Sequence, residues 1–222
     1  MDGFTHADAT AGLSEPELRA TATYEVRALA EDMRIGGISL GSVIPSRFPE
    51  TGATQTQSTD YRLLDAMFEA VRLRDEDVLL DVGCGEGRVL SYLYLRGFRG
   101  HIIGIELDPE IAQISRGRLD GLENIEVITG NVFDRSDLIV RATALFAFNP
   151  FYGNTTLDFI ELIERVKTEP VRFYYCGDYY HAFFDERQGW TRLASDEVHR
   201  VGAEPLSYSI YEYVPVQSTM ES

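Results

Sequence analysis

A glycine-rich turn carries the clearest chemical signal in the chain. It reads Asp81-Val82-Gly83-Cys84-Gly85-Glu86-Gly87 and follows an apolar run that begins at Val78. Glycines let a backbone approach a ligand closely, and a helix that starts after such a turn offers free N–H groups. A dinucleotide-binding turn has the spacing G-x-G-x-x-G and holds a pyrophosphate. Here the spacing is G-x-G-x-G, and an aspartate two residues before the first glycine suits an ammonium group better than a pyrophosphate.

Three further segments contain polar or aromatic residues that could hold a ligand. Glu106 lies nineteen residues after Gly87, where nucleoside-binding α/β folds place a carboxylate that accepts the ribose hydroxyls. The other two segments are Thr129-Gly130-Asn131-Val132 and Phe148-Asn149-Pro150-Phe151-Tyr152-Gly153. Each of the three also has a plainer interpretation, as a solvated acid at a strand end or as an ordinary tight turn.

A candidate general base lies in the segment Asp178-Tyr179-Tyr180-His181. An imidazole accepts a proton near neutral pH, although a lone histidine early in a helix is more often structural. The remaining histidines lack the spacing of metal ligands, so no metal site is predicted. The aromatic residues between positions 173 and 213 suit a wall for a flat organic acceptor, and they equally suit the core of two closing strands.

Alternating strands and helices must position these residues. Strands are expected at residues 78–82, 101–107, 125–129, 143–148 and 171–176, with two more within 192–214. Helical spacing of apolar residues separates most of them, which predicts an α/β fold: a doubly wound, mostly parallel seven-stranded sheet with helices on both faces. Ligands of such sheets bind at the carboxyl ends of the strands. Every segment described above falls at such an end.

An N-terminal extension precedes this predicted sheet. Residues 1–13 are small and polar and are expected to form a loose arm. A capping box at Ser14–Glu17 begins a helix, whose apolar stripe is Leu18, Ala22, Val26, Leu29 and Met33. Residues 38–59 are expected to be a linker with little regular structure. We therefore predict an extension of residues 1–54, whose helix is a lid, a dimer contact or simple packing, and a domain of residues 55–222.

The composition limits the classes of partner. The chain has 222 residues and a formal net charge of -16, so repulsion of phosphate backbones makes nucleic acid an unlikely partner. No apolar run has membrane-spanning length, and residues 1–20 do not resemble a secretory signal. The two cysteines, Cys84 and Cys176, are expected to be reduced thiols. We therefore expect a cytoplasmic protein without membrane contact, either a monomer or a homodimer, that acts on a small molecule.

The glycine turn resembles a known family motif. Residues 78–87 match the pattern hydrophobic-hydrophobic-D-x-G-x-G-x-G of the class I S-adenosylmethionine-dependent methyltransferases, which are Rossmann-like proteins. The resemblance implies S-adenosylmethionine as cofactor and S-adenosylhomocysteine as product. It further implies that Glu106 holds the ribose and Leu107 packs on the adenine. Asn131 stands where many members have aspartate, and its oxygen would accept from the adenine amino group while the Val132 N–H donates to the ring.

The segment at residues 148–153 resembles the N-P-P-Y/F motif of family members that methylate amines and amides. In those enzymes the asparagine oxygen and a proline carbonyl accept from the target nitrogen, and the aromatic ring packs on the substrate. Asn149 and Pro150 match this motif, whereas Phe151 replaces the second proline. N-methylation is therefore only slightly favoured over O-methylation. A nitrogen acceptor would make Asn149 essential, and an oxygen acceptor would instead require a base such as His181.

The sequence thus predicts a methyltransferase that acts on a small or medium organic acceptor. The predicted cofactor-binding residues are Asp81, Gly83, Cys84, Gly85, Gly87, Glu106, Leu107, Asn131, Val132, Asn149 and Pro150. The predicted catalytic residues are Asn149, Tyr152 and His181, and the predicted substrate-binding residues are Phe151, Tyr152, Tyr179 and Tyr180. One alternative is a non-catalytic regulatory protein that binds S-adenosylmethionine. Another, a nicotinamide oxidoreductase, is opposed by the glycine spacing and by the acid that precedes it.

Overall fold

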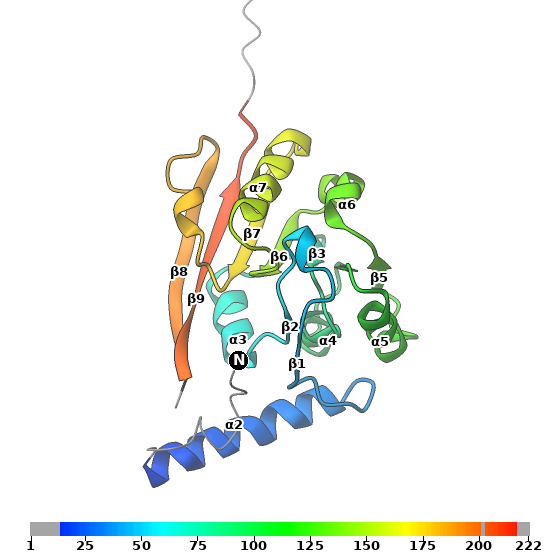
Figure 1. Cartoon of the computed structure of the whole chain (residues 1–222), viewed down its shortest axis with the longest axis vertical. Helices are drawn as coiled ribbons and strands as arrows, with labels where there is room; N and C mark the ends of the chain where they lie inside the picture. The colour runs from blue at the N-terminus through cyan, green and yellow to red at the C-terminus, as the bar shows by residue number, and fades with distance from the viewer. Residues whose placement is uncertain (1–13, 201–202, 217–222) are drawn as a thin grey trace, which may run out of the picture.

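A seven-stranded sheet with helices on both faces forms the body of the protein (Figure 1). The structure is a computed structural model that describes residues 14–200 and 203–216, so the predicted arm at residues 1–13 lies outside the described residues. The strands of this sheet are β3 (Val78–Val82), β4 (His101–Glu106), β5 (Ile125–Thr129), β6 (Ala144–Phe148), β7 (Val171–Cys176), β8 (Trp190–Arg200) and β9 (Ala203–Tyr213).

The strand order is β5-β4-β3-β6-β7-β9-β8. The five strands from β5 to β7 in this order are parallel, and β9 is antiparallel to both of its neighbours. The chain moves outward from β3 through β4 to β5, and then returns to the other side of β3 with β6. This reversal creates a switch point between β3 and β6, where α/β sheets bind their ligands. The predicted fold class is confirmed.

Helices cover the sheet on two sides. The first side carries α3 (Tyr61–Ala70), α4 (Arg88–Leu95) and α5 (Pro109–Leu119), and the second carries α6 (Ser136–Arg141) and α7 (Asn154–Val166). In β3, Leu79 packs in the core under α3 and α4, whereas Leu80 and Val82 pack in the core under α6 and α7. Successive side chains of a strand point to opposite faces. Burial on both faces explains why these strands are continuous apolar runs in the sequence.

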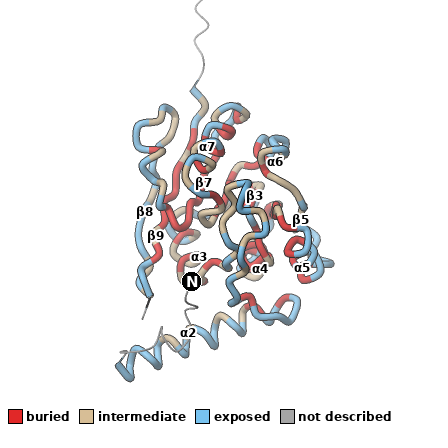
Figure 2. The backbone as a smooth tube through the Cα atoms, in the orientation of Figure 1, coloured by how far each residue is buried: buried red, intermediate tan, exposed pale blue. Residues whose placement is uncertain are grey.

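The N-terminal helix α2 (Glu15–Met33) packs along one end of the domain with its predicted apolar stripe turned outward. Val26 is 67% exposed and Met33 is 49% exposed, and the tube is pale blue along most of this helix (Figure 2). Tyr24 and Asp32 face the body instead. Polar contacts, and not the apolar stripe, join the inward face of this helix to the body. The hydroxyl of Tyr24 accepts from the Tyr61 N–H at 3.0 Å, and Asp32 lies in a buried ion pair.

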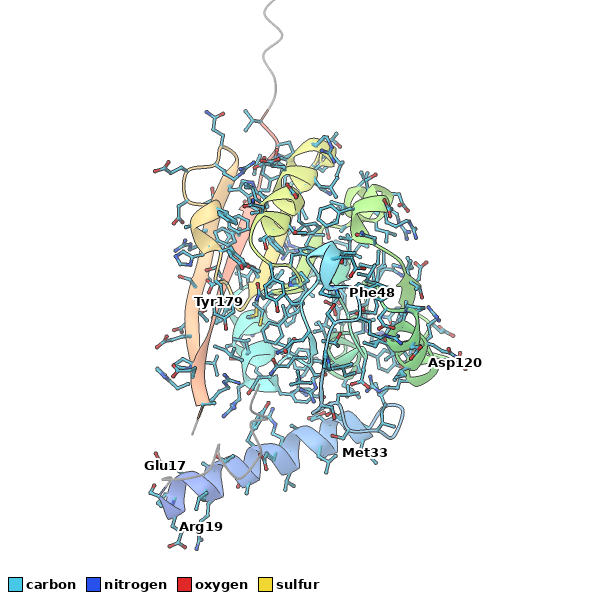
Figure 3. The ribbon with its side chains drawn as sticks, in the orientation of Figure 1. Glu17, Arg19, Met33, Phe48, Asp120 and Tyr179 are labelled. Atoms are coloured by element: carbon cyan, nitrogen blue, oxygen red, sulfur yellow. The ribbon has the colours of Figure 1, made fainter. Side chains whose placement is uncertain are left out.

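Residues 38–59 form a strap across the carboxyl ends of the central strands, where the sequence predicted an irregular linker. The strap contains β1 (Val43–Ile44) paired with β2 (Thr56–Gln57), and a short 3-10 helix, η1 (Pro49–Thr51). It passes in front of the sheet in Figure 1, and Figure 3 labels Phe48 on it. An isolated bridge joins Ala53 to Phe151. The predicted domain boundary between residues 54 and 55 falls inside this strap.

No helix in the two described ranges, 14–200 and 203–216, is long and apolar enough to cross a membrane.

Candidate active site

A pocket of about 890 Å³ lies at the switch point. Its floor is formed by the ends of β3, β4 and β6, one side by the loop after β5, and its cover by strap residues 51 and 53–59. Among the predicted site residues it is lined by Asp81, Gly83, Cys84, Gly85, Glu106, Leu107, Asn131, Val132, Pro150 and Phe151.

The glycine turn serves two different purposes. Gly83, Gly85 and Gly87 all have positive φ angles, which residues with a side chain adopt only at a cost. A Cβ on Gly85 would lie 2.8 Å from the Thr56 methyl group of the strap, so Gly85 keeps the cover close to the turn. A Cβ on Gly87 would lie 2.6 Å from the hydroxyl of Ser115 on α5. Gly87 does not line the pocket, and its lack of a side chain lets α4 pack against α5.

Asp81 lies at the bottom of the pocket with one oxygen unpaired. Its side chain is 2% exposed, and its Oδ2 atom has no hydrogen-bond partner among the described residues. Burial raises the pKa of this carboxyl well above its usual value, and the negative charge of Glu106 raises it further. An unpaired buried carboxylate is costly unless a donor meets it. An ammonium group would supply that donor and charge, so the site fits the amino acid end of S-adenosylmethionine.

Glu106 holds the neighbouring part of the site. Its Oε2 accepts from the Gly85 N–H at 2.9 Å, and its Oε1 accepts from the Asp108 N–H at 3.0 Å. Burial raises the pKa of Glu106, and backbone donors of Asp108, Gly85 and Leu107 oppose the shift. An ionised carboxylate offers about four lone-pair positions, so acceptor capacity is left for a ligand hydroxyl. The side chain is thereby oriented before any ligand binds.

Leu107 and the segment after β5 line the side of the pocket. Leu107, Asn131 and Val132 all contribute to its wall. The Oδ1 atom of Asn131 accepts from the Phe133 N–H at 3.1 Å and caps the 3-10 helix η2 (Val132–Asp134). This bond fixes the amide and leaves its NH2 group as the remaining donor.

Asn149 lies at the end of β6 in an uncommon backbone conformation, with φ at 38°. Its backbone carbonyl accepts from the Thr54 hydroxyl at 2.9 Å, and its side-chain oxygen accepts from the Tyr175 hydroxyl at 3.4 Å. Its neighbours Phe148 and Pro150 line the pocket, whereas Asn149 is not among the lining residues. Such conformations persist where surrounding contacts hold them, and they gather at functional sites.

The aromatic residues after Asn149 have separate surroundings. Phe151 packs between Phe133 and Phe159, at ring distances of 5.4 and 5.5 Å, and borders the pocket with one edge. Tyr152 is 56% exposed and does not line the pocket. Phe151 is therefore mainly a core residue.

Two predicted residues of the segment after β7 line a different pocket. Tyr179 and His181 line a second, shallower pocket of about 870 Å³ beside β8 and β9, and Figure 3 labels Tyr179 there. A ring nitrogen of His181 lies 3.1 Å from the Asp178 carbonyl oxygen. Tyr180 stacks on Phe183. The structure thus does not bring these three residues together with the glycine turn.

Sequence reasoning missed the strap and Arg88 as parts of the site. The strap contributes a row of hydroxyl and amide residues to the pocket: Thr51, Thr54, Gln55, Thr56, Gln57, Ser58 and Thr59. The available signal was the alternation of short hydroxyl residues with glutamines in the sequence. In the structure, Thr54, Thr56 and Ser58 are partly buried, whereas Gln55 and Gln57 are exposed. Their polar character instead suggested a linker.

The strand order, the glycine turn and the acid at the end of β4 together define a Rossmann-like, class I methyltransferase fold. Residues 73–188, more than half of the chain, match the family described as methyltransferase domain. The chain belongs to this family, which confirms the resemblance seen in the sequence and S-adenosylmethionine as the cofactor.

Known proteins similar to this chain carry names that refer to different methyl acceptors. Probable ribosomal RNA small subunit methyltransferase A of Methanopyrus kandleri is 29% identical over 92 residues, or 40% of this chain and 32% of that protein. The chain therefore matches about a third of that relative's length. The O-methyltransferase TomG of Streptomyces achromogenes, solved with S-adenosylmethionine, has a TM-score of 0.58 at 13% identity and covers 92% of this chain and 100% of that one. An RNA methyltransferase of Salinibacter ruber, solved with S-adenosylhomocysteine, has a TM-score of 0.51 at 19% identity. The similarity covers 74% of this chain and 97% of that one.

These similarities correct one expectation. The net charge of -16 suggested that nucleic acid is an unlikely partner. Two of the similar proteins are named as RNA methyltransferases, so net charge alone does not exclude such an acceptor. The physical reason is that the total charge does not determine the local surface that meets a substrate.

Proposed function

We propose that this protein transfers a methyl group from S-adenosylmethionine to a nitrogen of a planar organic group held at the end of β6. The observation that carries the proposal is the placement of Asn149, with its strained backbone, between the two pocket-lining residues Phe148 and Pro150. S-adenosylmethionine supplies an electrophilic methyl group on a sulfonium. The protein has to bind the two reactants, orient them and exclude water.

Three acidic or amide side chains have proposed roles in this arrangement. Asp81 binds the ammonium group of the cofactor, because its buried Oδ2 has no other partner among the described residues. Glu106 accepts hydroxyl hydrogens with the lone pairs that Gly85 and Asp108 leave free. The Asn149 amide oxygen accepts from the acceptor nitrogen. Its present hydrogen bond from the Tyr175 hydroxyl is long, at 3.4 Å, so the oxygen can readily exchange that donor for the acceptor nitrogen.

The absence of a histidine from the pocket supports nitrogen over oxygen as the acceptor. Among the described residues, the ionisable groups that line the pocket are Asp81, Cys84, Arg88 and Glu106, and burial raises the pKa of the Cys84 thiol. An uncharged amine attacks with its lone pair and loses its proton afterwards, so it needs no strong base. A hydroxyl needs a base near the reacting atom, and His181 lines the other pocket.

The planar group is proposed to be an amine or amide on an aromatic or conjugated ring. Phe148 and Pro150 offer flat apolar surfaces beside Asn149. Both a free small molecule and a base within an RNA carry such a group, and the similar proteins include enzymes named for RNA and an O-methyltransferase. The source of the ring is therefore left to experiment, whereas the proposal commits to the nitrogen.

The test combines purified protein, methyl-labelled S-adenosylmethionine and two acceptor pools. One pool contains heteroaromatic amines and amides, and the other contains total RNA with and without nuclease treatment. The labelled product is then analysed by mass spectrometry and NMR for the methylated atom. A methyl group on a ring or exocyclic nitrogen, lost in Asn149→Ala, supports the proposal. A methyl group on oxygen overturns it, and cofactor binding without turnover on any pool favours the non-catalytic alternative.

A further inference from the structure

Asp32 on α2 lies at the centre of a buried polar cluster outside the pocket. Its side chain is 1% exposed, and it accepts from the Arg88 guanidinium through Nε at 3.0 Å and Nη2 at 2.7 Å. It also accepts from the Leu40 N–H at 2.9 Å and from the Tyr61 hydroxyl at 2.7 Å. Four donors satisfy the lone pairs of one carboxylate. A paired and fully hydrogen-bonded charge of this kind is the form in which buried ions are tolerated.

Arg88 connects this cluster to the cofactor pocket. It is the first residue of α4, directly after Gly87, and its side chain lines the pocket although it is only 7% exposed as a residue. Its Nη1 atom donates to the Thr59 carbonyl at 3.1 Å and lies 3.5 Å from the Ser58 carbonyl. A single guanidinium therefore joins the end of the glycine turn, the last residues of the strap and, through Asp32, the N-terminal helix.

This connection fixes the distance between the strap and the glycine turn. The strap carries Thr56 so close to Gly85 that a Cβ on the glycine would lie 2.8 Å from the threonine methyl group. Thr56 lies three residues before Thr59, which Arg88 holds. Without Asp32, Arg88 has no carboxylate partner among the described residues, and its hold on the Thr59 carbonyl is weakened.

The ion pair also sets the charge of the pocket. Asp81, Glu106 and Arg88 are the charged groups that line it among the described residues. S-adenosylmethionine carries a positive sulfonium, and an ammonium group near neutral pH. Asp32 neutralises Arg88, so that the two pocket carboxylates face the cofactor without an opposing cation. Removal of Asp32 would leave an unpaired positive charge beside a positive ligand.

We infer that Asp32 is a positioning residue for S-adenosylmethionine binding, acting through Arg88 and the strap. It stands 49 residues before Asp81 and contributes nothing to the pocket lining. The N-terminal helix is thereby part of the cofactor site. This inference concerns cofactor affinity and is independent of which atom is methylated, so its test needs no acceptor.

The test is calorimetric titration of Asp32→Asn with S-adenosylmethionine, beside a turnover assay at saturating cofactor. Asparagine keeps the shape but removes the charge that pairs with Arg88. Its single oxygen can take the place of Oδ2, which accepts from the Leu40 N–H, while its NH2 group can donate to the Tyr61 hydroxyl oxygen in place of Oδ1. We expect the dissociation constant to rise about tenfold or more, as for loss of one charge-assisted hydrogen bond. Turnover at saturating cofactor should stay within about threefold, since Asp32 does not touch the reacting atoms. An unchanged dissociation constant in the folded variant overturns the inference.

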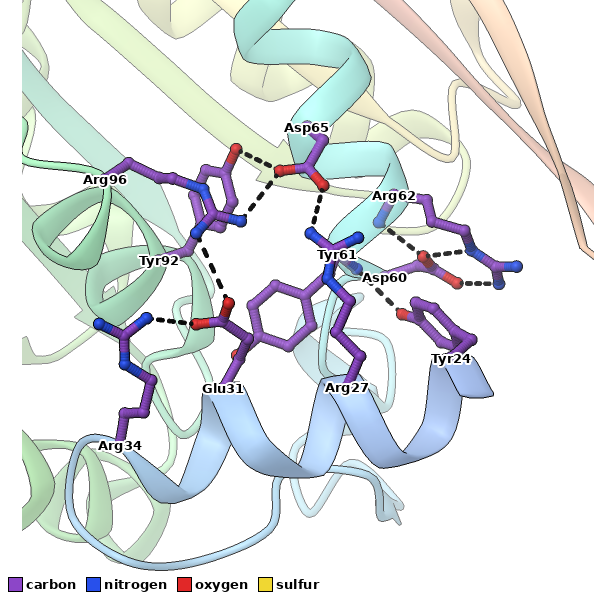
Figure 4. A network of polar contacts seen from close by, with 10 residues as sticks. All are labelled: Tyr24, Arg27, Glu31, Arg34, Asp60, Tyr61, Arg62, Asp65, Tyr92 and Arg96. Carbon is purple, nitrogen blue, oxygen red and sulfur yellow. Dashed lines mark hydrogen bonds and ion pairs between the residues drawn. The ribbon is translucent and has the colours of Figure 1, made fainter. Parts of the chain in front are cut away.

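The matched control is Glu31→Gln, the neighbouring carboxylate on the same helix. Glu31 pairs with Arg34 at 3.0 Å and with Arg96, at the far end of α4, at 3.6 Å (Figure 4). It helps to dock α2 without contacting the start of α4 or the strap. We expect its cofactor affinity to remain within about twofold of the wild type. Equal losses in both variants would show that helix docking alone matters, which also overturns the specific role of Asp32.

A milder variant keeps the inference testable if Asp32→Asn does not fold. Tyr61→Phe deletes only the hydroxyl that donates to Asp32 at 2.7 Å and leaves the ion pair in place. We expect a two- to fivefold rise in the dissociation constant, on the order of one neutral hydrogen bond. Denaturant unfolding of the same samples separates this change from general destabilisation. Wild-type affinity in Tyr61→Phe together with an insoluble Asp32→Asn would assign Asp32 to folding alone and overturn the inference.

Discussion

The Thr54 hydroxyl donates a 2.9 Å hydrogen bond to the backbone carbonyl of Asn149, across 95 residues of sequence. The bond joins the strap to the end of β6. The Thr54 N–H also donates to the Pro150 carbonyl at 3.0 Å, and the Tyr152 N–H donates to the Gly52 carbonyl at 3.0 Å. The cover of the cofactor pocket is thus attached to the segment proposed to hold the acceptor.

Thr54→Val tests this attachment. The substitution removes the hydroxyl but keeps the side-chain shape, so the strap should open more readily and release the cofactor faster. We expect the dissociation rate of S-adenosylmethionine to rise by about two- to tenfold, the effect of one neutral hydrogen bond. Stopped-flow displacement measures that rate. The control is Thr23→Val on α2, whose hydroxyl bonds only within its own helix, to the Arg19 carbonyl, and which should leave the rate unchanged.

Asn149→Ala should lower turnover much more than cofactor affinity. The amide is proposed to accept from the reacting nitrogen, and an interaction with the reacting centre counts most in the transition state. We expect kcat to fall by roughly 10- to 100-fold while the dissociation constant of S-adenosylmethionine changes less than about threefold. Tyr175→Phe, which removes only the hydroxyl bonded to the amide, should cost less. A proportionate loss of cofactor affinity in Asn149→Ala would argue for a structural role.

His181→Ala should leave turnover within about twofold of the wild type. The imidazole lines the second pocket and lies beside the Asp178 carbonyl, away from the glycine turn. A nitrogen acceptor does not need this base. Steady-state rates across the neutral pH range give the comparison. A large loss of kcat that higher pH restores would instead identify His181 as the base for an oxygen acceptor.

Asp81 should make cofactor affinity depend on pH in a range above the one in which an exposed carboxyl titrates. Burial, followed by the charge of Glu106, raises the pKa of Asp81 in the empty pocket. The ionised form binds an ammonium group, so affinity should fall as the pH is lowered through this raised pKa. It should also fall above about pH 8, where an α-amino group loses its proton. Titrations in buffers of different ionisation enthalpy should detect proton release on binding, and Asp81→Asn should abolish both the release and the acid-side dependence.

Gly85→Ala and Gly87→Ala should fail in different ways. Alanine at position 87 collides with Ser115 and with Leu119 of α5, so its main effect should be a lower free energy of unfolding. Alanine at position 85 collides with the Thr56 methyl group, at the edge of the pocket, so its main effect should be weaker cofactor binding in a folded protein. Both positions have positive φ, which adds about 1 kcal/mol of strain to each. Denaturation and calorimetry on both variants separate the two losses, and identical profiles would contradict the division.

Local patterns in the sequence were enough to predict the sheet and the cofactor turn. Strands β3 to β7 were predicted within about a residue or two because each is a short apolar run bounded by turn residues. The turn at residues 81–87 could be read because its function depends on local backbone geometry, which glycine spacing records directly. Glu106 and Asn149 could be placed at strand ends for the same reason, since parallel strands bring their carboxyl ends to one edge.

The cover of the pocket and the residues outside it depend on contacts between distant segments, which the sequence does not reveal. The strap looked like a linker because its polar residues carry no periodic apolar signal, and its position depends on distant partners such as Arg88 and Asn149. His181 could not be separated from the site along the chain, because the loop after β7 can lead toward either pocket. The outward rotation of α2 could not be predicted for a similar reason, because the contacts on its inward face join distant residues, such as Asp32 and Arg88, which are 56 residues apart.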